Sequence, residues 1–133
     1  MCIRDRTLAD VDKKGVSIAV ADKSAYHLFM MRELKNAELV SADGIDGSYK
    51  LFVDSRLDAL AGLKPRLLTD QQKNPGSRVL EGQLTSVQQS IGTPKSRETA
   101  ARYLKEFAQD VKKSGLVKEL IERHKGPGVS VAP

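Results

Sequence analysis

Residues 16–28 read VSIAVADKSAYHL, and this stretch decides the fold. Residues 15–21 form a short, continuous apolar run with two valines and an isoleucine, which is typical of a β-strand buried on both faces. A polar turn follows at 22–24, and apolar residues then recur at helical spacing over 25–34, with Ser24 placed as the N-cap. The stretch predicts a strand that leads through a tight turn into a helix.

The same alternation continues along the chain. Further strands are predicted at 38–40, 57–62 and 78–80, and further helices begin at Ser48 and Arg66. Strands that alternate with helices indicate βαβ units with right-handed crossovers. We therefore expect an α/β fold built on a mostly parallel sheet.

The last third of the chain predicts two amphipathic helices. Residues 96–125 read SRETAARYLKEFAQDVKKSGLVKELIERHK, with apolar residues at helical spacing on both sides of Gly115. Ser96 is the expected N-cap of the first helix, and Gly115 is a natural left-handed stop between the two. Residues 84–92 favour a β conformation, and residues 127–133 are expected to form a frayed tail.

Composition places the chain among ordinary globular domains. It has 133 residues, of which 40% are apolar and 29% charged, and no apolar run approaches the roughly 18 residues of a membrane span. The single Cys2 cannot form an internal disulfide. The opening MCIRDR is too polar for a signal peptide and resembles a translated sequencing adapter. We therefore expect residues 1–9 to be a non-native or unstructured leader.

The net charge of +5 does not indicate nucleic-acid binding. Residues 95–133 hold nine Lys or Arg against five Asp or Glu, whereas residues 1–94 hold thirteen against twelve. The excess is interleaved with acids, as on a solvated helix face. Aromatic residues make up 5% of the chain, too few for a base-stacking platform.

Several strings resemble the second lobe of a type II periplasmic binding protein, in the family 3 amino-acid-type receptors of ABC importers. They are GVSIAV at 15–20, KSAY at 23–26, DALAG at 58–62 and the tail SGLVKELIERHK at 114–125. The resemblance covers residues 10 to 130. It implies a three-layer second lobe at 10–83, a return crossing at 84–95, and C-terminal helices at 96–126 that pack on a first lobe missing from an incomplete chain.

The resemblance also implies a function. It predicts the substrate-binding component of an ABC importer, which closes by hinge motion around a small, anionic or amino-acid-like solute and is recognised by a membrane permease. Such a receptor is periplasmic or lipid-anchored outside the cytoplasm, with its signal peptide outside this sequence, and is a monomer at full length. No cofactor, metal or catalytic residue is expected.

The candidate ligand site lies in the turn before the first helix. In the family, the residue matching Ser24 holds the ligand carboxylate, together with N–H groups at the helix start, here those of Ala25 and Tyr26. Lys23 stands where the family usually has Gly, and Leu63 stands where it has the acid that pairs with a ligand ammonium. The resemblance with these departures implies an anionic or apolar solute. Ser24 as a helix cap alone remains the alternative.

Two other functions remain open on the same fold. One is an enzyme similar to cyclohexadienyl dehydratase, for which Asp22 is the candidate acid. The other is the effector-sensing domain of a transcription regulator. Catalytic signals are otherwise weak, because His27 and His124 lie far apart and no HExxH, CxxC, GxSxG or P-loop motif occurs.

Overall fold

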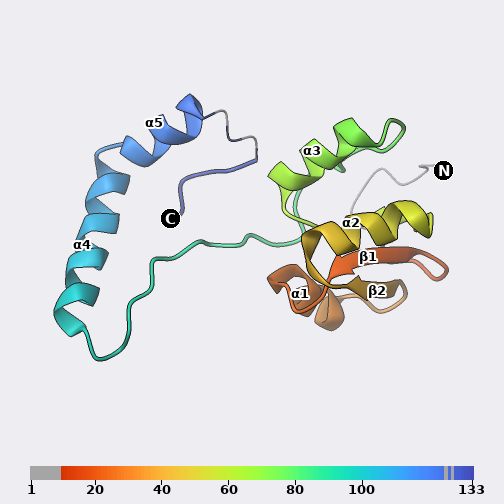
Figure 1. The fold of residues 1–133 in the computed structure, drawn as a ribbon, viewed down its shortest axis with the longest axis horizontal. Helices are drawn as coiled ribbons and strands as arrows, with labels where there is room; N and C mark the ends of the chain where they lie inside the picture. Colours follow the sequence, from red (N-terminus) through yellow and green to blue (C-terminus); the bar gives the residue numbers. More distant parts are fainter. Residues whose placement is uncertain (1–9, 125, 127) are drawn as a thin grey trace. The chain divides into compact units, whose positions relative to one another are not determined.

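The computed structural model describes residues 10–124, 126 and 128–133. The chain divides into two compact units, residues 1–86 and 87–133, which are described in turn (Figure 1). The predicted leader at 1–9 lies outside the described residues. Helices and strands are mixed, which confirms the α/β class in its coarse form.

The first unit is built on a small parallel sheet. Within the described residues the sheet has three strands, β1 (Ser17–Ala21), β2 (Glu38–Ala42) and β3 (Ala59–Leu60), in the order β2-β1-β3. Both neighbours run parallel to β1, with Ile18 opposite Leu39 on one side and opposite Ala59 on the other. The parallel sheet is therefore confirmed, although β3 is shorter than the predicted strand at 57–62.

Helices cover both faces of the sheet. A helix follows each strand: α1 (Ala25–Glu33), α2 (Gly44–Asp54) and α3 (Lys64–Lys73). Ile18 and Val20 are buried in one cluster with Tyr26 and Met30 of α1. Because side chains alternate along a strand, Ala19 faces the opposite side, which α2 covers (Figure 1). The two-sided burial expected of the apolar run is present.

The start of α2 differs from the prediction. Ser48 does not cap this helix, because α2 begins at Gly44 and the buried Ser48 lies inside it, its hydroxyl donating to the Ile45 carbonyl at 2.9 Å. A Cβ at Gly47 would lie 3.6 Å from the Cβ of Ala42. This is an ordinary contact distance, so residues 44–47 lie in the helix beside the end of β2 and do not form a loop.

The predicted strand at 78–80 is also wrong. In the described part of the first unit, the chain after α3 joins no strand of the sheet. The β-pairing found in this segment is an isolated bridge between Pro75 and Ser77. Leu80 and Leu84 pack against the core from this irregular segment. Their side chains are thus half-buried against the core, but without strand pairing. Residues 85–95 likewise lack regular structure, so the β preference of 84–92 is not realised.

The second unit contains the two predicted C-terminal helices, α4 (Glu98–Lys113) and α5 (Leu116–Arg123). Gly115 lies between them with a φ of 80°, the left-handed conformation that its sequence position predicts. Ser96 does not cap α4. The N–H of Arg97 donates to the carbonyl of Pro94 at 3.0 Å, and this turn places Arg97 at the N-cap.

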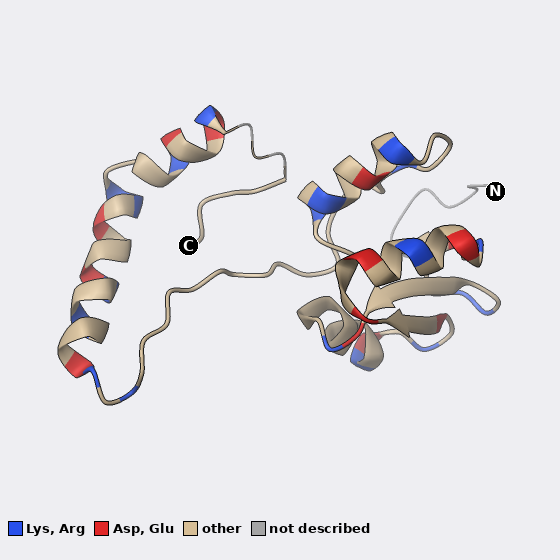
Figure 2. Ribbon diagram, in the orientation of Figure 1, with Lys and Arg blue, Asp and Glu red and all other residues tan. Residues whose placement is uncertain are grey.

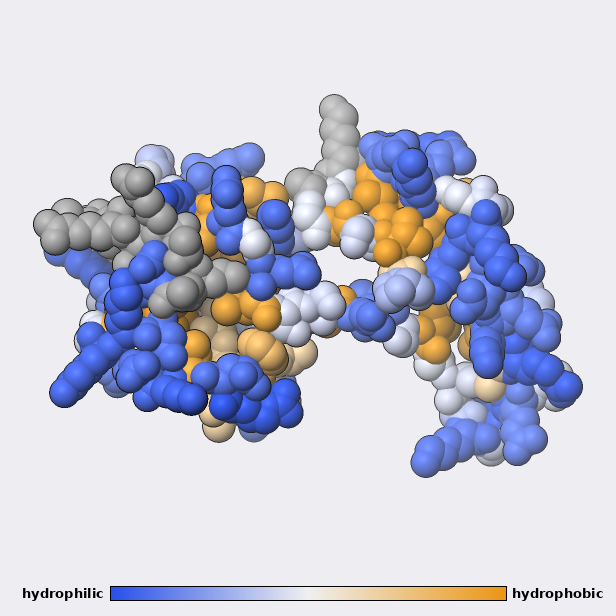
Figure 3. Space-filling view, turned by 180° about the vertical axis from the view of Figure 1, so that it is seen from behind, coloured by the Kyte–Doolittle hydropathy of each residue, from blue (hydrophilic) through white to orange (hydrophobic). Residues whose placement is uncertain are grey.

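Charged and apolar residues separate onto different faces of α4 and α5. Acidic and basic residues are interleaved along both helices, as the sequence predicts (Figure 2). Tyr103 and Phe107 stack with ring centroids 6.4 Å apart, and both are exposed. Hydrophobic side chains also gather over α5, where Leu116 and Leu120 are exposed (Figure 3). No helix in the described ranges has the length and apolar character needed to cross a bilayer.

Two carboxylates tie separate segments of the first unit together. Asp58 accepts hydrogen bonds from the hydroxyl and the N–H of Ser17, at 2.7 and 2.9 Å, and so joins the beginnings of β1 and β3. Asp12 accepts from three consecutive backbone N–H groups at 35–37, after α1. The Ser17 hydroxyl first, and then its N–H, hold the pKa of Asp58 below its usual value. The N–H groups of Asn36 and Ala37 do the same for the pKa of Asp12.

Neighbouring methionines on α1 provide a matched test of the core. Met30 is 1% exposed and Met31 is 62% exposed. Met30→Ala should lower the free energy of unfolding by about 2–4 kcal/mol, because it leaves a cavity beneath β1. Met31→Ala should change it by less than about 0.5 kcal/mol. Urea unfolding followed by circular dichroism measures both, and equal effects would contradict the described packing of α1.

The carboxylate ties predict an acid-sensitive fold. Both pKa values are lowered on folding, so the stabilisation is present above the ordinary value of 3.8 and is lost as the pH falls through the lower folded values. Asp12→Asn and Asp58→Asn should therefore lower stability at neutral pH and flatten the acid limb of the stability profile. Urea unfolding at a series of acid pH values tests this, with the exposed Asp54→Asn as control. An unchanged acid limb in both variants would contradict the ties.

Candidate functional site

The sheet topology fixes where the first three helices begin. The strands are parallel, and each continues into its helix within three residues, so α1, α2 and α3 all start at the carboxyl-terminal edge of the sheet. The chain leaves the central β1 toward β2 and then crosses to the other side for β3. In open α/β sheets, ligands bind outside the carboxyl ends of strands where connections diverge in this way. Here that position lies between β1 and β3.

The two turns at this position contain the predicted site residues. Lys23 and Ser24 lie in the turn between β1 and α1, and Leu63 lies in the turn between β3 and α3. The topology therefore brings residues that are about forty positions apart to one edge of the sheet. Asp58 is at the opposite edge, where it binds Ser17 at the start of β1, so its role is structural.

Ser24 is confirmed as the N-cap of α1. Its Oγ accepts from the N–H of His27 at 3.1 Å, and its backbone is extended, with φ −68° and ψ 158°. Because the hydroxyl accepts in this contact, its own hydrogen remains available for an additional acceptor. Capping and ligand binding are therefore compatible at Ser24, and its role as a ligand anchor stays a prediction.

Lys23 adopts the backbone conformation that glycine favours. Its φ is 55°, in the left-handed region that few non-glycine residues occupy. The conformation aims the Lys23 N–H at Nδ1 of His27, 3.0 Å away. Its ammonium is exposed and lies 3.6 Å from a carboxylate oxygen of Asp22. The turn thus has a geometric reason to prefer glycine, and a hydrogen bond compensates for the lysine.

The remaining predicted residues have different surroundings. Ala25 is exposed, whereas the side chain of Tyr26 is 8% exposed and belongs to the core, so Tyr26 can contribute only its backbone N–H at the turn. Leu63 is the N-cap residue of α3, and its side chain is 38% exposed. Ile45, in the first turn of α2, is also exposed at this edge. Exposed apolar residues at this edge therefore include Ile45 as well as the predicted Leu63.

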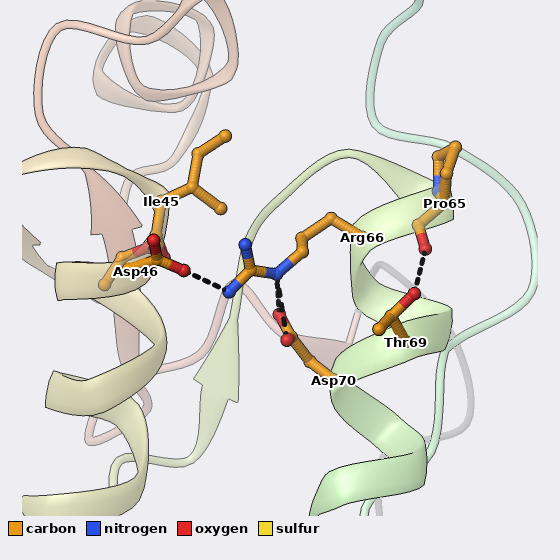
Figure 4. A network of polar contacts seen from close by, with 7 residues as sticks. Ile45, Asp46, Pro65, Arg66, Thr69 and Asp70 are labelled. Atoms are coloured by element: carbon orange, nitrogen blue, oxygen red, sulfur yellow. Dashed lines mark hydrogen bonds and ion pairs between the residues drawn. The ribbon is translucent and has the colours of Figure 1, made fainter.

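An ion-pair network with one buried carboxylate, Asp70, lies beside this edge and was not predicted. Nε of Arg66 is 2.9 Å from both oxygens of Asp70, and its Nη2 is 2.6 Å from Asp46 (Figure 4). Asp70 is 4% exposed. The hydrogen bond that Arg66 donates to Asp46, and then those it donates to Asp70, raise the pKa of Arg66 above its usual value. The network joins the first turn of α2 to α3.

The sequence gives only half of this network. Arg66 and Asp70 are four residues apart on a predicted helix, a spacing that favours pairing. Asp46 is twenty residues away on another helix, and no local pattern identifies it. Asp70 is buried and engages Arg66 through both oxygens, so it is not free to bind the ammonium group of a ligand, and Arg66 partly balances the charge of the exposed Asp46.

His27 is buried beside the candidate turn. It is 9% exposed, and its Nδ1 lies 3.4 Å from Asp22 in addition to accepting from Lys23. His124 is exposed at the end of α5 in the second unit. Over the residues that the structure describes, no three His, Cys, Asp or Glu side chains come together in a way that could hold a metal ion.

The Arg66 network gives a prediction about stability. Arg66→Gln should lower the free energy of unfolding by about 1–3 kcal/mol, because Asp70 would remain buried without its cation. Asp46→Asn should cost less than about 1 kcal/mol, because Asp46 is exposed. Adding Asp70→Asn to Arg66→Gln should recover part of the loss. Urea unfolding measures the series. A double variant with a lower free energy of unfolding than Arg66→Gln alone would contradict this account.

Comparisons with known proteins do not identify a family. No protein-family model matches the chain, and no match was found to a curated protein or to a solved structure. The resemblance to solute receptors, with the function that it implies, therefore stays a prediction.

Proposed function

We propose that this chain is part of the substrate-binding component of an ABC importer, and that residues 10–83 form one lobe of its solute site. The observation that carries the proposal is the strand order β2-β1-β3. This order places the divergence of connections between β1 and β3, where open α/β sheets bind their ligands. The turn at Lys23-Ser24 and the turn at Leu63 follow those two strands.

The start of α1 is suited to an anionic group. The N–H groups of a first helical turn have no acceptor within their helix, and the helix dipole adds a partial positive charge. Ser24 uses the N–H of His27 for capping, which leaves the N–H groups of Ala25 and Tyr26 for a ligand. The exposed ammonium of Lys23 adds a cation to the same turn.

The remainder of the edge favours an apolar body over an ammonium group. Leu63 and Ile45 are exposed there, and Arg66 already engages Asp46 and Asp70. Burying an ammonium without a carboxylate would be costly. The proposed solute is therefore a carboxylate with an apolar body. Asp43, exposed at the N-cap of α2, is the carboxylate that could accommodate an amino acid instead.

Transport would require a second lobe. In the proposed mechanism the lobes close around the solute by a hinge motion. A membrane permease then recognises the closed form on the side outside the cytoplasm. The exposed apolar residues of α4 and α5, including Phe107, Leu116 and Leu120, supply a surface on which such a lobe would pack.

Substitutions at Ser24 can separate capping from binding. Aspartate is as good an N-cap as serine, but its charge repels an anion. Ser24→Asp should therefore keep the stability of the fold and abolish anion binding. Ser24→Ala should weaken binding by about 1 kcal/mol, the scale of one hydrogen bond. Titrations of the whole chain with benzoate, succinate and L-alanine, followed by the amide resonances of Ala25 and Tyr26, measure the effect.

The control is Ser96→Asp, because Ser96 caps no helix in this structure. Equal benzoate binding by the wild type and Ser24→Asp would reduce Ser24 to a helix cap. L-Alanine binding as tight as benzoate binding would contradict the proposed solute class. In that case Asp43→Asn should abolish the L-alanine response.

A further inference from the structure

His27 holds the conformation of the turn through its ring. The N–H of Lys23 donates to Nδ1 at 3.0 Å, so this nitrogen carries a lone pair and the neutral ring has its hydrogen on Nε2. The backbone N–H of the same residue donates to Ser24 Oγ. His27 therefore fixes Lys23 with its side chain and Ser24 with its main chain.

The fixed conformation is one that Lys23 would not adopt alone. A left-handed φ of 55° is unfavourable for a lysine relative to the right-handed region. The hydrogen bond to Nδ1 offsets this cost, and it exists only while the ring is neutral. The side chain of His27 is 11% exposed, so water cannot easily replace the bond.

We propose that the turn at Asp22–Ser24 is a proton-operated switch, which protonation of His27 opens. A proton on Nδ1 would face the N–H of Lys23 as a second donor, and the two donors repel. Asp22 provides the alternative acceptor, because its Oδ1 already lies 3.4 Å from Nδ1. On protonation, Nδ1 of His27 therefore stops accepting from the Lys23 N–H and donates to Asp22 instead. Lys23 is then released from the left-handed region.

The charges around α1 leave Asp22 as the acceptor. In the part of the chain that the structure describes, no other carboxylate lies within 4.0 Å of a His27 ring nitrogen. Charged residues on the segments near α1 include Asp12, Arg32, Glu33, Glu38, Asp43, Lys64 and Glu81, and none of them is paired with the ring in the described residues. Of these, Asp12 is engaged by the backbone after α1. The ammonium of Lys23 approaches Asp22, not the ring.

The switch would regulate the proposed solute site, and this consequence rests on the proposed function. An open turn no longer orients the first N–H groups of α1 beside the Lys23 ammonium. The switch itself involves only residues of the turn and α1, so it can be tested without any solute. Failure of the switch and failure of the solute site are then separate results.

Nuclear magnetic resonance of the whole chain tests the switch directly. Imidazole is the side chain that changes charge between about pH 5 and 8. Over that range, the ring resonance of His27 and the hydrogen-exchange protection of the Lys23 amide should change with one midpoint. Protection of this amide should fall about tenfold or more as the ring gains its proton. In Asp22→Asn the loss of Lys23 protection should be smaller, because the protonated ring loses its acceptor.

A matched pair of histidine variants completes the test. In His27→Asn the amide oxygen can take the position of Nδ1 without titrating, so Lys23 protection should become independent of pH. The exposed His124→Asn should behave as the wild type does. Constant Lys23 protection while the His27 ring titrates would overturn the proposal, as would a His27 ring that stays neutral throughout. If His27→Asn does not fold, the wild-type midpoints decide alone.

Discussion

Burial of β1 on both faces is the constraint on which the rest of the structure depends. Ile18, Ala19 and Val20 are each at most 1% exposed, and β1 is hydrogen-bonded to a strand on either side. A parallel strand in this position needs a helix on each face and a crossover to each neighbour. Those needs determine where α1 and α2 lie and place the helix starts along one edge. The candidate site is thus a consequence of how the apolar run is covered.

The two edges of the sheet have different chemistry as a result. At the edge where strands begin, Asp58 joins β1 and β3 through Ser17, and these contacts are complete within the fold. At the other edge, helices begin and their first N–H groups lack partners in the helix. Only one of these groups, on His27, is capped by Ser24. Unused donors therefore remain at the edge where open α/β sheets bind their ligands.

Sequence patterns predicted the elements best where the residues of one short segment decide its structure. The apolar run at 15–21, the cap at Ser24 and the left-handed Gly115 all appear as expected, because each is a local requirement. Predictions failed where distant contacts decide. Ser48 was misplaced, because it lies buried inside α2, which begins at Gly44. The Arg66–Asp46 pair and the His27–Lys23 bond depend on tertiary positions or side-chain orientation, which no spacing rule encodes.

Lys23 shows how a departure from a local preference can indicate function. Glycine would occupy the left-handed position without cost, and it would not need His27 to hold it there. Lysine adds a cation beside the helix start, but makes the turn depend on the Nδ1 hydrogen bond. In the two proposals, the Lys23 charge that would favour an anion and the His27 ring that would sense protons are linked through one backbone N–H. Glycine at position 23 would remove both the cation and the strain, so the turn would no longer depend on His27.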